Sequence, residues 1–215
     1  MKRTFLSLIL ITAAVFAFAQ NPTAVIKEFT GTVELKPSGS ANWTPAKAGT
    51  VVQKSTIVST GFKSTAILTV GNSTITVHPL TRLSLEELMN QNQSETVDLK
   101  LNTGKVRVEV APPSGGRTSF TVQSPSATAS VRGTSFTMDS NSIQVQKGAV
   151  GYSSAGGSPV TVSAGNESYI DSDGNVVTAL AALEAAIVIP KTSGSAAKKT
   201  GAGSGIEINV ELIGE

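Results

Sequence analysis

The least ordinary stretch of the sequence lies at residues 124–136 and reads SPSATASVRGTSF. Pro125 lacks an amide hydrogen and biases Ser124 toward extended geometry, so the strand before it should end there at a corner. From Ala127 to Val131 small apolar and polar side chains alternate, which places every second residue on one face. Gly133 then interrupts this run, as is typical of a bulge, a bend or a close backbone approach. The stretch predicts short strands around a bend.

The composition favours an all-β fold. The 215 residues are enough to bury a sizeable core, and 20 of them are glycine. Only 5% are aromatic, and the apolar positions are mostly Val, Ile, Leu and Ala, which suit many short strands. Cysteine is absent, so packing and sheet hydrogen bonds must stabilise the fold without disulfides.

Residues 1–19 are predicted to form a signal peptide that is removed on export. Lys2 and Arg3 precede an apolar run, and Ala17-Phe18-Ala19 supplies the small-x-small pattern of a cleavage site before Gln20. A retained anchor helix is the alternative, but the run is shorter than the roughly 20 apolar residues that span a bilayer. We therefore expect a periplasmic or cell-surface protein with no transmembrane span in the mature chain.

The charge balance argues against a nucleic-acid partner. The whole chain has a net charge of +2, with 17 basic and 15 acidic residues. Cleavage would remove Lys2 and Arg3 and leave equal numbers of the two signs. No basic stripe remains to attract phosphate groups.

Alternating strands separated by glycine turns recur along the chain. Gly71-Asn72 stands between two alternating runs and predicts a tight hairpin. Asn102-Thr103-Gly104 is expected to form a second hairpin, with Val97–Leu101 and Val106–Val110 as its strands and their charged side chains as cross-strand neighbours. A strand over 142–146 should turn at Lys147-Gly148 into another strand. No exact repeat length emerges, so we expect an irregular coil of strands.

Few residues are candidates for chemistry. His78 is the only histidine and is expected to be a polar residue beside a turn, since no second histidine or cysteine accompanies it. The segment Asp171-Ser172-Asp173-Gly174-Asn175 begins like a calcium loop but lacks the distal glutamate, so a polar turn is favoured. Trp43 is expected to cap one end of the core. No metal or cofactor is predicted.

The C-terminal part divides into three segments after an all-β domain over residues 20–175. A short helix is expected over 176–190 and a flexible linker over 191–205. In the tail, residues 206–215, the apolar side chains alternate as in a strand. This segment either returns to an edge of its own domain or adds to a partner's sheet. The alternating residues are Ile206, Ile208, Val210 and Leu212.

These motifs together resemble the FecR-type domain of bacterial sigma-factor regulators and of stand-alone exported proteins. The resemblance covers roughly residues 24–170, and its most specific part is Val131-Arg132-Gly133-Thr134-x-Phe136. It also rests on the segments 31–33, 58–61, 64–68, 101–106, 147–150 and 162–167.

The resemblance implies an all-β domain coiled like a short right-handed β-helix, with no catalytic residues. The motif residues are accordingly interpreted as structural: Pro125, Val131, Arg132, Gly133, Thr134 and Phe136. Gly133 is expected to permit a bend between turns of the coil, so that Gly133→Val should impair folding. Arg132 is expected to hydrogen-bond carbonyl groups left open at that bend.

Three functions follow as hypotheses. The first is a noncatalytic exported binding or scaffold module for a protein or an envelope glycan. The second is envelope sensing that feeds a sigma-factor-type pathway through a membrane partner. The resemblance implies that role for the regulators, but this chain has a predicted signal peptide where they carry a cytoplasmic segment and a membrane helix. The third, a carbohydrate-active β-helix enzyme, could use only Arg132, Asp171 and Asp173, for which the sequence shows no convergence.

Overall fold

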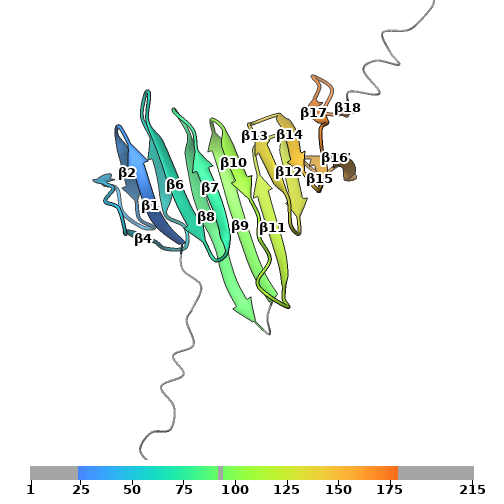
Figure 1. The fold of residues 1–215 in the computed structure, drawn as a ribbon. Helices are drawn as coiled ribbons and strands as arrows, with labels where there is room; N and C mark the ends of the chain where they lie inside the picture. The colour runs from blue at the N-terminus through green and yellow to red at the C-terminus, as the bar shows by residue number, and fades with distance from the viewer. Residues whose placement is uncertain (1–23, 92–93, 179–215) are drawn as a thin grey trace, which may run out of the picture.

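The computed structural model describes residues 24–91 and 94–178, which form two nine-stranded sheets (Figure 1). The expected all-β class is confirmed, and the described residues contain no helix and no closed barrel. Sheet A contains, in spatial order, β4 (Val51–Val52), β1 (Ala24–Thr30), β6 (Thr65–Val70), β7 (Ser73–Val77), β10 (Val106–Glu109), β13 (Ser135–Met138), β14 (Ser142–Lys147), β17 (Glu167–Ile170) and β18 (Val176–Thr178). Sheet B contains β3 (Thr44–Pro45), β2 (Val33–Lys36), β5 (Ile57–Thr60), β8 (Arg82–Gln91), β9 (Ser94–Thr103), β11 (Arg117–Gln123), β12 (Ala127–Val131), β15 (Ala149–Ser154) and β16 (Val160–Ser163).

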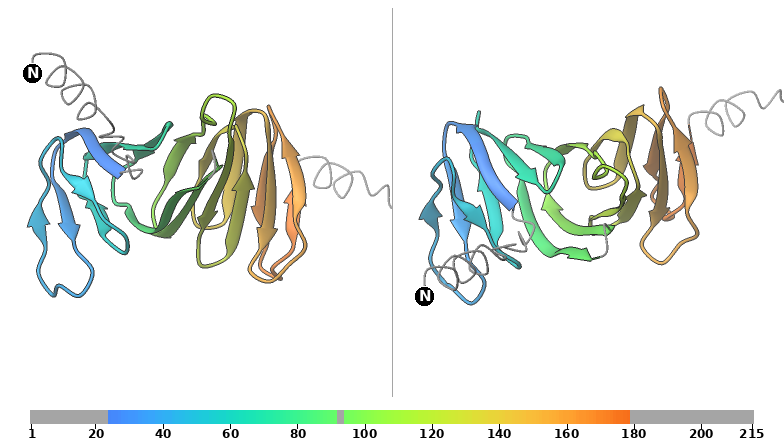
Figure 2. Two further views of the ribbon diagram at one scale, coloured as in Figure 1. Left: turned by 90° about the horizontal axis from the view of Figure 1, so that it is seen from below. Right: turned by 60° about the horizontal axis from the view of Figure 1, so that its bottom comes forward.

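The strands of both sheets follow one another along a single axis from the N-terminal to the C-terminal end (Figures 1 and 2). The pairing nevertheless differs from that of a right-handed β-helix, in which neighbouring coils are parallel. Every described ladder is antiparallel except that of β9 with β11. Only there does the chain complete one coil, passing from β9 through β10 in the other sheet to β11. Elsewhere, consecutive strands of the same sheet are joined by short turns. Such turns can connect antiparallel strands only, so the chain forms hairpins in place of the coils of a β-helix.

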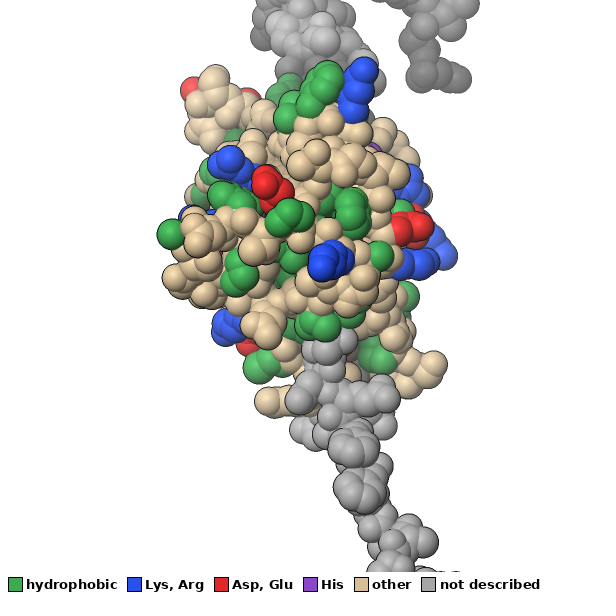
Figure 3. Space-filling model, turned by 90° about the vertical axis from the view of Figure 1, so that its left-hand side faces the viewer, with side chains coloured by type: hydrophobic (Ala, Val, Ile, Leu, Met, Phe, Trp, Pro, Cys, Tyr) green, Lys and Arg blue, Asp and Glu red, His purple; other side chains and the backbone are tan. Residues whose placement is uncertain are grey.

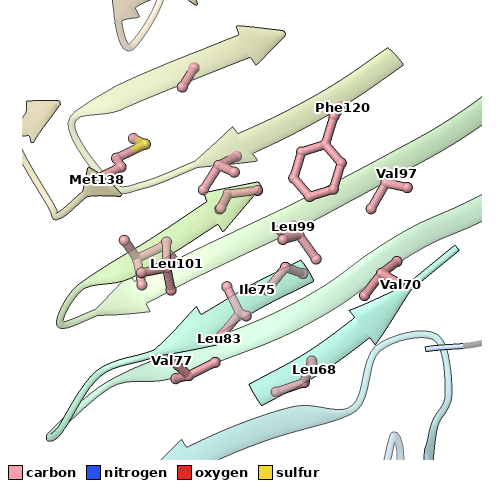
Figure 4. Close-up of a cluster of buried hydrophobic side chains, with 14 of the residues drawn as sticks. Leu68, Val70, Ile75, Val77, Leu83, Val97, Leu99, Leu101, Phe120 and Met138 are labelled. Carbon is pink, nitrogen blue, oxygen red and sulfur yellow. The ribbon is translucent and has the colours of Figure 1, made fainter. Parts of the chain in front are cut away.

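The core lies between the two sheets, where alternate side chains of facing strands meet (Figure 4). Leu68 and Ile75 in sheet A and Leu99 and Phe120 in sheet B point into this layer and are almost inaccessible to solvent. The period-two alternation in the sequence therefore predicted the inward faces of β6, β7 and β9 correctly, whereas β8 was not predicted.

The small side chains of the 124–136 stretch accommodate a large aromatic side chain. Ala127 and Ala129 of β12 are fully buried, and Ala129 lies directly opposite the buried Tyr152 of β15. The corner before them is held by Ser124, whose hydroxyl accepts a hydrogen bond from the Ala127 amide at 3.0 Å. The alternation of small residues thus provides space beside Tyr152 as well as a strand.

At three corners, where the chain passes from one sheet to the other, a glycine lies against a buried hydroxyl residue. A Cβ atom on Gly31 would approach Ser64 Oγ to 2.3 Å, and one on Gly104 would approach Thr81 Oγ1 to 2.2 Å. The residue after each glycine donates its amide to that hydroxyl, from Thr32 to Ser64 at 2.8 Å and from Lys105 to Thr81 at 3.0 Å. Only glycine leaves room for this contact.

The third corner pairs Gly148 with Thr134. Gly148 has φ of +82°, and its Cβ would lie 2.8 Å from the Thr134 methyl group. Thr134 Oγ1 is buried and has no hydrogen-bond partner among the described residues. Here the methyl group, rather than the hydroxyl, fills the space beneath the glycine.

The second predicted hairpin is wrong, because Gly104 is a corner. β9 belongs to sheet B and β10 to sheet A, where β10 pairs with β7 and β13. The charged side chains of β9 and β10 therefore lie on opposite outer faces and are not cross-strand neighbours. Lys147-Gly148 is likewise a corner, between β14 and β15, whereas Gly71-Asn72 forms the expected hairpin between β6 and β7.

The expectation for Gly133 is also corrected. Its φ lies outside the left-handed region, and a Cβ there would meet only Pro112, at the ordinary distance of 3.6 Å. Neither conformation nor crowding requires glycine at this bend. The position that requires glycine is Gly148, whose Cβ would also come within 3.1 Å of the Gly133 carbonyl oxygen.

Several predictions for the termini fall outside the described residues. These are the signal peptide over 1–19, the linker over 191–205 and the tail over 206–215. The helix expected over 176–190 is described only at its start, where Val176–Thr178 form strand β18 instead. Among the described residues no helix is long and apolar enough to cross a membrane.

We predict that Gly104→Ala destabilises the domain, whereas Gly133→Ala does not. A Cβ on Gly104 would lie 2.5 Å from the Thr81 Cα atom and would hold a φ of +91°. The left-handed conformation alone costs an L-residue about 1–2 kcal/mol, and the clash with backbone adds to it. Thermal unfolding of both variants measures the difference, and equal melting temperatures would contradict the role given to the corner.

Candidate functional site

A groove of about 710 Å³ crosses the outer face of sheet A. Its floor comes from β7, β10, β13 and β14. Its walls come from the β6–β7 turn, the segment after β10 and the corner that precedes β13. The lining residues are Asn72, Thr74, Arg107, Glu109, Val110, Ala111, Pro112, Gly133, Thr134, Ser135, Gln146 and Lys147.

The strand register aligns four polar side chains along the groove floor. Thr74 pairs with Glu109, Glu109 with Ser135, and Ser135 with Lys147. Neighbouring strands lie about 4.8 Å apart, so the row extends across roughly 14 Å of sheet. Such a row offers hydrogen-bond donors and acceptors at regular spacing to a ligand that lies across the strands.

The groove contains both signs of charge. Arg107 Nη2 lies 3.1 Å from Glu109 Oε1 within one strand, and both side chains are about half exposed, so the pair contributes little to stability. Lys147 is exposed and forms no ion pair with the described residues. Its ammonium group is therefore available to an anionic group of a ligand.

The sequence motif does not form one site. Val131 and Phe136 point into the core, and Pro125 lies in the turn between β11 and β12, at the opposite end of β12 from Gly133. Only Gly133 and Thr134 reach the groove, as part of its wall. The burial of Val131 and Phe136 agrees with the structural role expected for them. The other motif residues lie in separate parts of the domain.

Arg132 does not play the part expected from the sequence. Its side chain is exposed on the side of sheet B, beside a hollow of about 390 Å³, and makes no hydrogen bond to any described residue. Asp171 and Asp173 lie in the turn between β17 and β18 of sheet A. The three residues suggested for a carbohydrate-active enzyme therefore belong to different sheets and do not converge.

The turn at residues 171–175 is a self-contained polar turn, as the sequence favoured. Asp171 Oδ1 accepts hydrogen bonds from the amides of Asp173 at 2.9 Å and Asn175 at 2.8 Å. These bonds, that of Asn175 above all, lower the pKa of the exposed Asp171. No group of three or more His, Asp or Glu side chains in residues 24–91 and 94–178 is arranged to hold a metal ion.

His78 lies beside the corner that follows β7, where the sequence placed it. Its backbone amide donates to the Lys105 carbonyl at 3.0 Å. Burial, followed by the positive charges of Lys105 and Arg107, lowers the pKa of its imidazole. The lowered pKa favours the neutral form of this side chain at pH 7.

Trp43 is not a cap on the core. It is half-buried and lies outside the buried cluster, with Lys36 Nζ 5.9 Å and Arg82 Cζ 5.8 Å from the ring centroid. The ring thus contributes to a cationic surface on sheet B. Figure 3 shows the N-terminal end of the sandwich, where apolar, basic and other polar side chains are interspersed.

Glu95 is a buried carboxylate that the sequence analysis did not single out. It is 3% exposed, and its Oε2 atom has no hydrogen-bond partner among the described residues. Its neighbours in the sheet are Asn90 and Thr118, and the Asn72 amide donates to its carboxylate. Burial raises the pKa of Glu95 above its ordinary value, and the Asn72 bond offsets part of this effect. The sequence could have indicated this burial, because Glu95 occupies an inward-facing position of an alternating strand.

Comparison with models of known protein families finds a match to one family. The family model described as FecR protein matches residues 56–151, which include β5 to β14 and the groove floor. No curated protein matches the chain.

Two crystal structures are similar to this chain, both described as a "putative anti-sigma factor" from Parabacteroides distasonis. Each shares 15% sequence identity with it, and the TM-scores are 0.47 and 0.46. The matched region covers 57% of this chain and 58% of the other, so this chain spans less than two thirds of that protein.

We predict that Glu95→Gln stabilises the domain at neutral pH and has little effect near pH 4. The pKa of Glu95 is higher in the folded state than its ordinary value. The folded state therefore has its full stability below the ordinary pKa, where Glu95 is protonated, and loses stability as the pH rises through the raised pKa. Each unit of upward shift corresponds to about 1.4 kcal/mol. Melting temperatures across this pH range measure the effect.

The exposed Glu28 provides the matched control for that experiment. Glu28→Gln should follow the native protein at every pH. A stability difference between Glu95→Gln and the native chain that does not grow with pH would contradict a raised pKa.

Proposed function

Because the chain belongs to the FecR family, we propose that it is a noncatalytic exported binding module that engages a protein partner through the groove of sheet A, which has a polar floor. The observation that carries the proposal is the groove itself, a formed concavity lined by residues of the matched region. Four paired strands form the floor, so the groove already has its shape before a partner binds. Binding therefore does not have to offset the entropy cost of ordering these residues.

The chemistry of the groove suits recognition better than catalysis. Its only ionisable side chains are Arg107, Glu109 and Lys147, and the arginine and the glutamate already pair with each other. A catalytic site needs an acid or base positioned against a nucleophile and a stabiliser of developing charge. The groove offers instead hydroxyl, amide and charged groups in a row.

A protein partner fits this lining better than a glycan does. No aromatic side chain is among the residues that line the groove, so a sugar ring would find no stacking surface there. Asn72, Ser135 and Gln146 can exchange hydrogen bonds with a peptide backbone, and Lys147 can pair with a carboxylate. Charge complementarity of this kind favours specificity and fast association.

Export is part of the proposal and rests on the sequence pattern of residues 1–19. We expect the mature protein to begin at Gln20 and to accumulate in the periplasm or at the cell surface. Mass spectrometry of the protein isolated from its native envelope measures its N-terminus. Recovery of the intact N-terminus from a membrane fraction would contradict cleavage.

A photo-crosslinking amino acid at Ser135, on the groove floor, tests the binding function in the native envelope. We expect a discrete protein adduct from Ser135 and none from Thr121, which points outward on sheet B. Lys147→Glu should weaken that adduct several-fold, whereas Lys100→Glu on the other sheet should not. Adducts from Thr121 alone, none from either position, or adducts with glycan only would overturn the proposal.

The identity of the partner separates plain binding from envelope sensing. The family match supports the sensing alternative as well, because the sequence motifs resemble the FecR-type domain of sigma-factor regulators. A membrane-embedded regulatory protein crosslinked through Ser135 would place this chain in a signalling pathway. A structural envelope protein would identify it as a scaffold.

A further inference from the structure

The C-terminal end of sheet B presents an unprotected edge. β16 is the last strand of this sheet, and no described strand pairs with its outer side. Its four residues include no charged side chain, although Pro159 precedes them. Natural edge strands are commonly blunted by charges, by proline or by brevity. The opposite edge of the same sheet follows this rule, because β3 has two residues and one of them is Pro45.

The inward face of β16 is only partly covered. Val162 is 2% exposed, whereas Val160, which lies on the same face opposite the buried Tyr152, is 37% exposed. Alternate residues of one strand share a face, so Val160 points toward the core layer, and the described residues leave it partly uncovered there. One more strand beside β16 would place side chains about 5 Å from Val160 on that face.

We propose that residues 206–213 of the same chain pair with β16 as an additional edge strand. The apolar side chains of Ile206, Ile208, Val210 and Leu212 alternate with polar ones. In a strand beside β16 these four would face inward and extend the core past Val160. Glu207 and Glu211 would then face outward with Asn209.

Charge favours β16 over the corresponding end of sheet A. The outward side chains of β15 and β16 are uncharged, and include Ala149, Gly151, Thr161 and Ser163. At the same end of the molecule the edge strand of sheet A is β18, which follows the turn that carries Asp171 and Asp173 and pairs with β17, where Glu167 is exposed. Two outward glutamates on a strand beside β18 would add negative charge to an edge that is already acidic, which does not arise on sheet B.

The connecting chain is long enough for the segment to return to its own domain. Residues 179–205 separate it from β18, and the linker predicted over 191–205 would by itself have an end-to-end distance of about 20 Å. The two sheets of a sandwich lie about 10 Å apart. A tether of this kind gives the segment a local concentration in the millimolar range, which favours its own β16 over that of a second molecule.

The absence of cysteine permits a direct test by engineered disulfides. Thr161→Cys on β16 is combined in turn with Glu207→Cys, Asn209→Cys and Glu211→Cys in the full chain. We expect at least one pair to oxidise within a single molecule, since paired strands bring Cα atoms within the roughly 4.4–6.8 Å that a disulfide spans. Thr74→Cys on the outer face of sheet A, combined with the same three, is the matched control and should not crosslink.

Hydrogen exchange provides a readout that does not depend on new cysteines. Ile208→Asp with Val210→Asp should speed amide exchange in residues 160–163 by tenfold or more and leave β12 unchanged, because only the β16 edge loses its cover. Glu207→Gln with Glu211→Gln should leave both strands protected. Disulfide-linked dimers, equal crosslinking of the Thr74 control, or exchange in β16 that ignores the aspartates would each overturn the proposal. The groove takes no part in this pairing, so its failure would leave the proposed function intact.

Discussion

The close contact between a corner glycine and a buried hydroxyl residue is the constraint on which the sandwich depends. At Gly31 and Gly104 the backbone comes so near to Ser64 and Thr81 that no side chain fits between them. The hydroxyl then accepts the amide of the next residue, which would otherwise lose its partner as the chain leaves the sheet. These two corners thus send the chain to the other sheet while the amide at the corner keeps a hydrogen-bond partner.

The corners also explain why the domain is a sandwich of hairpins with a single complete coil. A corner changes the sheet, whereas a turn such as Gly71-Asn72 keeps the chain in the same sheet and reverses it. From β9 the chain takes a corner, crosses through β10 and returns to sheet B as β11, parallel to β9. The segment after β10 that closes this coil supplies Val110, Ala111 and Pro112 to one wall of the groove. The proposed binding surface is thus a consequence of the only parallel ladder in the described strands.

The groove illustrates how the FecR motif relates to function. Val131 and Phe136 stabilise the core, and Gly133 and Thr134 shape a groove wall. The polar floor comes from Thr74, Glu109 and other outward residues that no local motif distinguishes. A local sequence motif therefore identifies the fold, while the surface that can bind a partner is assembled from four strands that are not contiguous in the sequence.

The sequence by itself determined many of the strands and their inward faces, although not β8 or β18. Alternation with a period of two marked the buried residues of β6, β9 and β12, and the absence of cysteine and the low aromatic content fitted an all-β core. It also identified the FecR motif and the polar turn at Asp171. These features are local, so a window of ten residues contains them.

Only the tertiary structure decided which sheet each strand joins. The runs on either side of Gly104 look like a hairpin because both alternate and both face inward, but a strand that faces inward from sheet A has the same pattern as one that faces inward from sheet B. The same limitation concealed the requirement for glycine at position 148 rather than 133, the burial of Glu95 and the groove. Each depends on a neighbour distant in sequence, such as Thr134 for Gly148 or the Gly71-Asn72 turn for Glu95, and no local pattern encodes that distance.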